Sequence, residues 1–267
     1  MMKLDNLVVL IRGGGEVASG VAHRLFRAHF KVCLTEVACP QAVSRGVTFS
    51  EAIYDGEKEI EGVTARLVKS AGEIPGVWHG NKLPIMVDPE LTTRGALHPD
   101  VLIDAIMAKR NLGTKISDAP LVIGLGPGFR VGRDVHLAVE TNNSESLGEV
   151  ILDGEAESDT GIPIAIGGLT FERVVHSPGD GLFLADREIG DLVTAGEVIA
   201  SVGGQEVRAP IDGVLRALLR SDIEVEKGIK LGEVDPTGER EPCYRIRARI
   251  RAIAGGVLEA ILMRFNV

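Results

Sequence analysis

One glycine-rich segment and one acidic residue have types and spacing that could bind a ligand. Gly13-Gly14-Gly15 follows an apolar run, Leu7–Ile11, and precedes a segment, Glu16–His29, with apolar residues at helical spacing. The pattern Gly13-x-Gly15-x-x-Ala18 is typical of a loop whose backbone N–H groups face a phosphate at a helix N-terminus. Glu36 lies about 20 residues further on, where a carboxylate can accept hydrogen bonds from ribose hydroxyls.

The same glycines have a second interpretation. They permit a tight strand-to-helix turn without any ligand, and Glu16 then stabilises the helix N-terminus through its charge. The Glu16 carboxylate would also stand beside the expected phosphate. The sequence therefore leaves nucleotide binding and a structural turn as alternatives.

A second glycine loop follows another apolar run. Pro120–Ile123 predicts a buried strand, and Gly124, Gly126 and Gly128 come after it. Asp88 follows a further predicted strand, Leu83–Val87. Because parallel strands place such loops on one carboxyl edge, we expect both loops and Asp88 to flank one crevice.

The segment between those strands predicts a helix, Pro99–Gly113, with Pro near its start and Gly as its stop. Lys109 and Arg110 would lie in its last turn. There they could clamp a phosphate or balance the helix dipole, and the second role is the more ordinary one.

Thiols and one histidine complete the residues that could do chemistry. Cys39 follows the second predicted strand, Lys31–Val37, and could carry sulfur or selenium transiently, although a bystander thiol is the simpler interpretation. Cys33 lies inside that apolar strand and is expected in the core. His136 and Glu140 fit the polar face of a strand better than a metal site, so no metal is predicted.

Charge and composition exclude several classes of protein. The chain has 29 Lys and Arg against 38 Asp and Glu, a net charge of −9, which disfavours nucleic acid and anionic membranes as partners. The longest uncharged stretch, Thr160–Phe171, is broken by Gly and Pro, so no membrane span is expected. Three cysteines without paired spacing indicate reduced thiols and a cytoplasmic protein.

The C-terminal half contains an internal repeat. Val175–Val202 aligns without gaps with Val207–Val234, and each copy has strand-like segments separated by Pro-x-Asp-Gly and Val-x-x-Gly turns. This organisation is typical of a biotinyl/lipoyl-like barrel-sandwich. The stretch between the copies, Val202–Val207, has no lysine, so covalent biotin or lipoate is not expected.

The last segments are expected to pack back on the body of the protein. Tyr244–Ile250 alternates like an exposed strand, and Val257–Phe265 predicts a helix with an apolar stripe. That stripe could cap a domain or form part of a contact in a homo-oligomer.

Several longer strings resemble one family, the selenium-dependent molybdenum hydroxylase system proteins. They are Ile11–Gly20, Asp104–Thr114, Leu121–Phe129, Asp159–Pro163 and Gly255–Ala260. The resemblance implies an accessory protein that helps to mature or activate such hydroxylases, with a molybdenum hydroxylase as partner. It also implies an N-terminal domain similar to the Rossmann-like domain of xanthine dehydrogenase accessory proteins.

By the same resemblance, the glycine loops form a crevice for a nucleotide or dinucleotide, with NAD or a molybdopterin nucleotide as candidates. Asp88, Lys109, Arg110 and Asn111 lie in matching motifs without a settled role. The candidate binding residues are thus Gly13, Gly14, Gly15, Glu16, Ala18, Glu36, Asp88, Gly124, Gly126, Gly128, Lys109, Arg110 and Asn111, with Cys39 as a possible thiol carrier.

The expected fold class is α/β. We expect a Rossmann-like parallel sheet domain over residues 1–171, a small duplicated barrel-sandwich over 172–240, and a strand and helix over 241–267. Two other functions stay open: an NAD(P)-dependent oxidoreductase acting on a small substrate, and a non-enzymatic docking scaffold. The sequence does not decide whether any reaction is catalysed.

Overall fold

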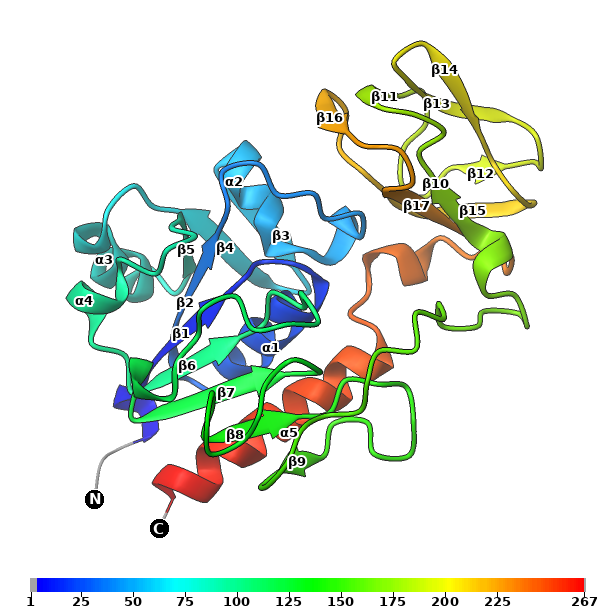
Figure 1. Cartoon of the computed structure of the whole chain (residues 1–267). Coiled ribbons are helices and arrows are strands. Elements are labelled where there is room, and N and C mark those ends of the chain that lie inside the picture. Colours follow the sequence, from blue (N-terminus) through cyan, green and yellow to red (C-terminus); the bar gives the residue numbers. More distant parts are fainter. Residues whose placement is uncertain (1–3, 267) are drawn as a thin grey trace. The chain divides into compact units, whose positions relative to one another are not determined.

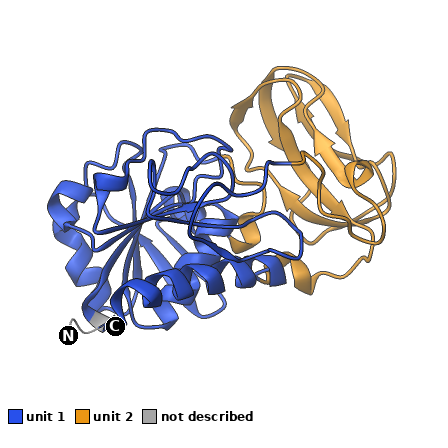
Figure 2. Cartoon of the chain, turned by 60° about the horizontal axis from the view of Figure 1, so that its bottom comes forward, with its two compact units in different colours: residues 1–40, 48–159, 246–267 blue, residues 41–47, 160–245 orange. Residues whose placement is uncertain are grey.

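The computed structural model describes residues 4–266, which fold into two compact units (Figure 2). Unit 1 comprises residues 1–40, 48–159 and 246–267, and unit 2 comprises residues 41–47 and 160–245. The short segment 41–47 therefore leaves the first unit and returns to it, and unit 2 is inserted before the last helix.

Unit 1 is built on one nine-stranded sheet (Figure 1). Its strands are β1 Val8–Arg12, β2 Lys31–Glu36, β3 Glu57–Ile60, β4 Val63–Leu67, β5 Leu83–Val87, β6 Val101–Asp104, β7 Leu121–Leu125, β8 Leu137–Val139 and β9 Val150–Ile151. Its helices are α1 Glu16–Arg27, α2 Ala52–Asp55, α3 Ile74–His79, α4 Arg94–Leu97 and α5 Ala248–Phe265. The expected strands near residues 7–11, 31–37, 83–87 and 120–123 and the helix after Gly15 are confirmed as β1, β2, β5, β7 and α1.

The strand order is β3-β4-β5-β2-β1-β6-β7-β8-β9. Strands β4 to β8 of this order run parallel, whereas β3 and β9 pair antiparallel at the two edges. The chain leaves β1 toward β2 and later returns to the opposite side of β1 as β6. The carboxyl ends of β1 and β6 therefore lie where the strand order reverses, the usual place for a crevice in an open α/β sheet.

Both faces of the sheet are covered. Val9 and Ile11 of β1 pack with α1 and α5 on one face, while Leu10 packs with residues of α3 on the other. This is why β1 reads as a continuous apolar run rather than an alternating one. Helices α1 and α5 lie side by side (Figure 1).

The two helices approach closely at Gly20 of α1. A Cβ atom there would lie 2.2 Å from Cγ2 of Ile250 in α5, which is too short for any side chain. Ile246, Ile250 and Ile253 are buried in this contact region at helical spacing. The expected strand Tyr244–Ile250 is wrong for this reason: a buried helical face outweighs the alternating arginines, and α5 begins at Ala248.

The expected helix Pro99–Gly113 is also wrong. Val101–Asp104 is strand β6, buried on both faces between β1 and β7, and residues 105–115 form an irregular loop. A short apolar run fits a buried strand and a helix face equally well, and the partner strands decide between them.

Unit 2 contains eight short strands. They are β10 Val174–His176, β11 Gly181–Ala185, β12 Leu192–Val193, β13 Val198–Val202, β14 Gln205–Arg208, β15 Gly213–Leu218, β16 Ile223–Val225 and β17 Lys230–Asp235. They form two antiparallel sheets, β10-β17-β15-β12 and β14-β13-β11-β16. The first sequence copy supplies β10–β13 and the second supplies β14–β17. If each strand is replaced by its counterpart in the other copy, so that β10 exchanges with β14 and β13 with β17, the strand order of one sheet becomes that of the other. Each sheet therefore contains two strands from each copy.

The fold class expected from the sequence is therefore corrected. Unit 1 has a mixed nine-stranded sheet rather than a Rossmann-like parallel one, and unit 2 has two separate antiparallel sheets rather than a biotinyl/lipoyl-like barrel-sandwich. The antiparallel edge strands arise from hairpin connections that local patterns did not reveal. No helix in residues 4–266 is long and apolar enough to cross a membrane.

The contact at Gly20 gives a first prediction. Gly20→Ala should destabilise the protein by about 2 kcal/mol, because the added methyl group overpacks the α1–α5 contact. The matched control is Gly255→Ala in α5, where the Cβ position is open and alanine should stabilise the helix by about 0.5–1 kcal/mol. Urea unfolding monitored by circular dichroism measures both, and equal effects would contradict the packing argument.

Candidate ligand-binding site

The glycine loop between β1 and α1 packs closely against the residues that follow β6 and end β2. Gly13 has φ +106°, and a Cβ there would lie 3.0 Å from the carbonyl oxygen of Ala105. A Cβ on Gly14 would lie 3.2 Å from Glu36 Oε2. Only Gly15, the N-cap of α1, has open space at its Cβ position. Packing against the protein therefore accounts for the first two glycines, and the third leaves room for a ligand.

Glu36 at the end of β2 holds this loop. Its Oε2 accepts a hydrogen bond from the Gly14 N–H at 2.7 Å, and its Oε1 accepts one from the Val37 N–H at 2.8 Å. Burial raises the pKa of Glu36, and these two hydrogen bonds oppose the rise. The Gly13 N–H donates to the Thr35 carbonyl at 2.8 Å. Gly15 is the N-cap of α1, and the first N–H groups of an α-helix have no carbonyl partner within the helix.

A pocket of about 330 Å³ opens at the carboxyl ends of β1, β2 and β6. Its walls are Arg12, Gly13, Thr35, Glu36, Val37, Pro89, Glu90, Ile106 and Leu112. Val37, Ile106 and Leu112 are 44%, 37% and 42% exposed, so the pocket has an apolar rim around a polar base. We call it the β1–β6 pocket; it lies where the strand order reverses.

Arg12 forms hydrogen bonds to two different segments that line the β1–β6 pocket. Its Nη1 donates to Thr114 Oγ1 and the Leu112 carbonyl, both at 3.1 Å, and lies 3.4 Å from Asp104 Oδ2. Its Nη2 donates to the Pro89 carbonyl at 3.4 Å. Arg12 Nε is buried and has no hydrogen-bond partner within residues 4–266.

Thr35 has a second unpaired side-chain group near this pocket. The residue is 1% exposed, and its Oγ1 has no hydrogen-bond partner in the described part of the chain. Because this oxygen is itself buried, it does not contribute to the accessible surface of the pocket.

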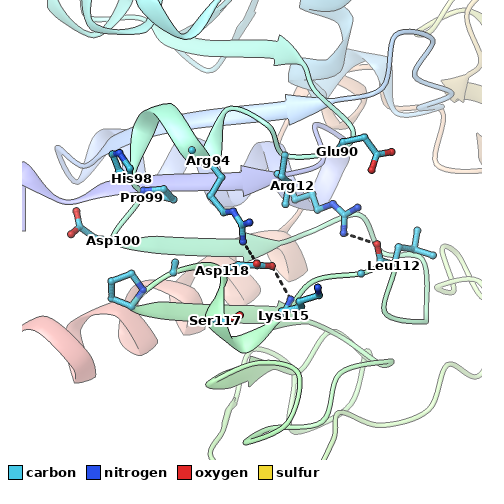
Figure 3. A pocket seen from close by; sticks show the side chains of 15 residues that line it. Arg12, Glu90, Arg94, His98, Pro99, Asp100, Leu112, Lys115, Ser117 and Asp118 are labelled. Atoms are coloured by element: carbon cyan, nitrogen blue, oxygen red, sulfur yellow. Dashed lines mark hydrogen bonds and ion pairs between the residues drawn. The ribbon is translucent and has the colours of Figure 1, made fainter.

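A larger polar groove of about 840 Å³ adjoins this pocket and shares Arg12, Glu90 and Leu112 with it (Figure 3). Arg12 and Leu112 lie at one end of the groove, and His98 and Asp100 lie at the other. An ion pair between Arg94 and Asp118 crosses it. Acidic and basic groups are mixed along its walls, so the groove shows no single charge preference.

The structure places the predicted residues of the first loop together. Gly13 and Glu36 share the wall of the β1–β6 pocket, and Gly14 and Gly15 continue from it into α1. Glu16 forms an ion pair with Arg247 at 3.0 Å, which offsets its charge beside the loop. Ala18 is fully buried in α1.

The second glycine loop follows β7 and lines neither cavity described above. Each of its glycines meets another part of unit 1. A Cβ on Gly124 would lie 2.5 Å from the Phe129 ring, one on Gly126 would meet Thr141 Oγ1, and one on Gly128 would lie 2.5 Å from Arg110 Cα. Close packing therefore accounts for these glycines.

The remaining predicted residues lie outside the β1–β6 pocket. Lys109 pairs with Asp159 at 2.5 Å, and Arg110 is exposed. Asn111 closes a turn by accepting hydrogen bonds from the Gly113 and Thr114 N–H groups. Cys39 is an exposed free thiol, and neither cavity includes it. The described residues contain no group of three or more His, Cys, Asp or Glu that could hold a metal ion.

Asp88 organises the turn after β5. Its Oδ1 accepts hydrogen bonds from the Thr92 N–H and hydroxyl, and its Oδ2 accepts one from the Thr93 N–H at 2.7 Å. Burial alone would raise the pKa of Asp88, but the hydrogen bonds from Thr93 and Thr92 outweigh it and lower the pKa. This turn carries Pro89 and Glu90 into the pocket wall.

The sequence missed seven pocket residues: Arg12, Thr35, Val37, Pro89, Glu90, Ile106 and Leu112. Arg12, Thr35 and Val37 are adjacent in sequence to the glycine loop or to Glu36. The prediction that this carboxyl edge of the sheet binds a ligand could therefore have included them. Ile106 and Leu112 fell inside the wrongly predicted helix, which hid the loop that forms one wall.

No family model matches the chain. A curated relative, the "Uncharacterized protein YqeB" of Escherichia coli strain K12, is 44% identical over 256 residues, which are 96% of this chain and 47% of the relative. The chain thus spans about half the length of the curated relative that it matches.

Similar solved structures are matched only weakly. Product-bound ectoine utilization protein EutE from Ruegeria pomeroyi is 13% identical with a TM-score of 0.26, and the match covers 86% of this chain and 85% of that one. An aspartoacylase family protein from Mesorhizobium loti is 12% identical with a TM-score of 0.27 and the same coverage. A succinylglutamate desuccinylase from Silicibacter has 14% identity, a TM-score of 0.25, and coverage of 86% and 84%. Scores this low give no functional argument.

These matches correct the family resemblance drawn from the sequence motifs. The curated relative is described as uncharacterized, and the solved structures as ectoine-utilization, aspartoacylase-family and desuccinylase proteins. None of these proteins is described as a molybdenum hydroxylase accessory protein. The assignment to the selenium-dependent molybdenum hydroxylase system, the maturation role and the hydroxylase partner are therefore wrong. The oxidoreductase and docking-scaffold alternatives gain no support either.

The Asp88 turn gives a pH-dependent prediction. Because the folded-state pKa of Asp88 is lowered, its stabilisation is present above the unfolded pKa of about 4 and is lost as the pH falls through the folded-state value. Asp88→Asn should therefore cost about 2 kcal/mol at neutral pH and less in acid. Urea unfolding at pH 7 and pH 3 measures this, with exposed Asp153→Asn as control. A cost that does not change with pH would contradict the account.

Proposed function

We propose that unit 1 binds a nucleotide or dinucleotide in the β1–β6 pocket. The observation that carries the proposal is that Glu36 and Gly13 share one pocket wall. A carboxylate suited to ribose hydroxyls thus lies next to a loop that leads into a helix N-terminus.

Glu36 can still accept hydrogen bonds from a ligand. Each of its oxygens takes one backbone N–H, and a carboxylate oxygen offers two acceptor positions. Two vicinal hydroxyl groups of a ribose match this capacity. Arg12, which lines the same pocket, adds a guanidinium group beside the carboxylate.

The apolar rim supports a flat, apolar part of the same ligand. Val37 follows β2 and Ile106 follows β6, so they stand on different sides of the pocket entrance. Both are exposed although they are large and apolar. A purine or pyrimidine ring would cover them and remove apolar surface from water.

The phosphate end would extend toward Gly15. Its open Cβ position and the positive N-terminal end of α1, a helix of 12 residues, favour an anion there. The ion pair between Glu16 and Arg247 offsets the charge of the acidic residue in the first turn of α1, which the sequence placed beside the expected phosphate.

The proposal concerns binding and assigns no reaction. We also propose a cytoplasmic location, because Cys33, Cys39 and Cys243 are free thiols.

Isothermal titration calorimetry with AMP, ADP, ATP, GTP and NAD⁺ tests the proposal. We expect at least one of them to bind and Glu36→Gln to weaken that binding on the order of tenfold, because an amide cannot accept at both positions. The control is Glu59→Gln, an exposed carboxylate on edge strand β3. Thermal melts check that both variants fold.

Two results would contradict the proposal. One is that none of the five compounds binds at concentrations of about 1 mM. The other is that Glu36→Gln and Glu59→Gln, both folded, bind the nucleotide as tightly as the unmodified protein.

A further inference from the structure

A separate cavity of about 300 Å³ lies between α1 and α5. Its walls are Gly20, His23, Arg24, Arg27, Ala28, Ile246, Arg251 and Leu258. It shares no residue with the β1–β6 pocket, so nothing proposed above assigns it a role. We call it the α1–α5 cavity.

The charges around the α1–α5 cavity are almost all positive. Its walls carry three arginines and one histidine and no carboxylate. The acid that neighbours it is Glu61, whose two oxygens both lie 2.7 Å from Arg251 Nη2. Glu61 Oε1 also accepts a hydrogen bond from the Ile246 N–H. One carboxylate therefore offsets one guanidinium, and Arg24 and Arg27 remain as excess charge in a chain whose net charge is −9.

The sequence of α1 creates this cluster. Gly20, His23, Arg24 and Arg27 recur at intervals of three and four residues, so they share one face of the helix. Gly20 permits the close approach of Ile250, which holds α5 beside that face. The cations are thus gathered by helix packing rather than by a flexible loop.

The individual contacts leave donors available. Arg24 Nη2 donates to the Arg251 carbonyl at 3.3 Å. Arg27 is exposed and makes no hydrogen bond or ion pair within residues 4–266. His23 is 3% exposed, and its Nε2 lies 3.4 Å from the Glu61 carbonyl. Burial lowers the pKa of His23, and Arg27 and Arg251 lower it further, while the backbone contact and charge of Glu61 oppose this.

We propose that the α1–α5 cavity binds the phosphate group of a small molecule. Guanidinium groups donate paired hydrogen bonds in a geometry that matches phosphate oxygens. A bound dianion would also offset the mutual repulsion of Arg24, Arg27 and Arg251. The cavity volume accommodates a phosphate together with a small attached group.

Inorganic phosphate is the probe for the test. Isothermal titration calorimetry on the full chain should detect phosphate binding that Arg27→Gln weakens on the order of tenfold. Arg27 is exposed, so this variant should fold normally. The matched control is Arg130→Gln, an exposed arginine of unit 1 that pairs with Glu155 and lies outside the cavity. The control should bind phosphate like the unmodified protein.

A second cavity variant locates the bound phosphate. Arg24→Gln should also weaken phosphate binding, because Arg24 lines the α1–α5 cavity and not the β1–β6 pocket. The proposal is overturned if phosphate fails to bind at about 10 mM, or if Arg27→Gln binds it as tightly as Arg130→Gln. Neither result would bear on nucleotide binding at Glu36.

Discussion

The turn from β1 into α1 leaves little room for side chains at Gly13 and Gly14, and the carboxyl edge of the sheet is organised around this constraint. Gly13 lies against Ala105 after β6, and Gly14 lies against Glu36 at the end of β2. The central strand is thereby fixed to both of its neighbours at the point where the strand order reverses. The β1–β6 pocket is the space left between these three ends once their backbones have come this close.

Some charged groups of unit 1 stabilise the fold, and others have no partner among the described residues. The carboxylate of Asp88 is fully used by hydrogen bonds within its own turn, and Arg12 joins the loop after β5 to the loop after β6, so both shape the pocket wall. Glu16 is held by Arg247 beside the glycine loop. Arg27, by contrast, has no hydrogen bond or ion pair among the described residues. Groups whose hydrogen bonds are complete explain the fold, while an exposed cation such as Arg27 indicates where a ligand could bind.

The sequence predicted those parts of the structure that local patterns determine. A continuous apolar run, three glycines and an i, i+4 pattern were enough for β1, α1 and β2, and the repeat anticipated that both halves of unit 2 have the same strands. Residues 99–113 and 244–250 failed because tertiary partners decided their conformation. The glycines after β7 were mistaken for a ligand loop because Phe129, Thr141 and Arg110 approach them only in the folded chain. Glycine motifs that arise from close backbone packing determine local geometry, and they do not by themselves determine function.

The central claim is that a nucleotide occupies the ends of β1, β2 and β6. Hydrogen–deuterium exchange of the full chain with and without ADP tests it most directly, because it locates the ligand without a mutation. The account predicts added protection from exchange in the segments 12–20, 34–38 and 104–114. Little change is expected in residues 160–245 of unit 2. Added protection confined to other segments would contradict the account. The account would also be contradicted if ADP left exchange unaltered throughout the chain and another nucleotide added protection only in other segments.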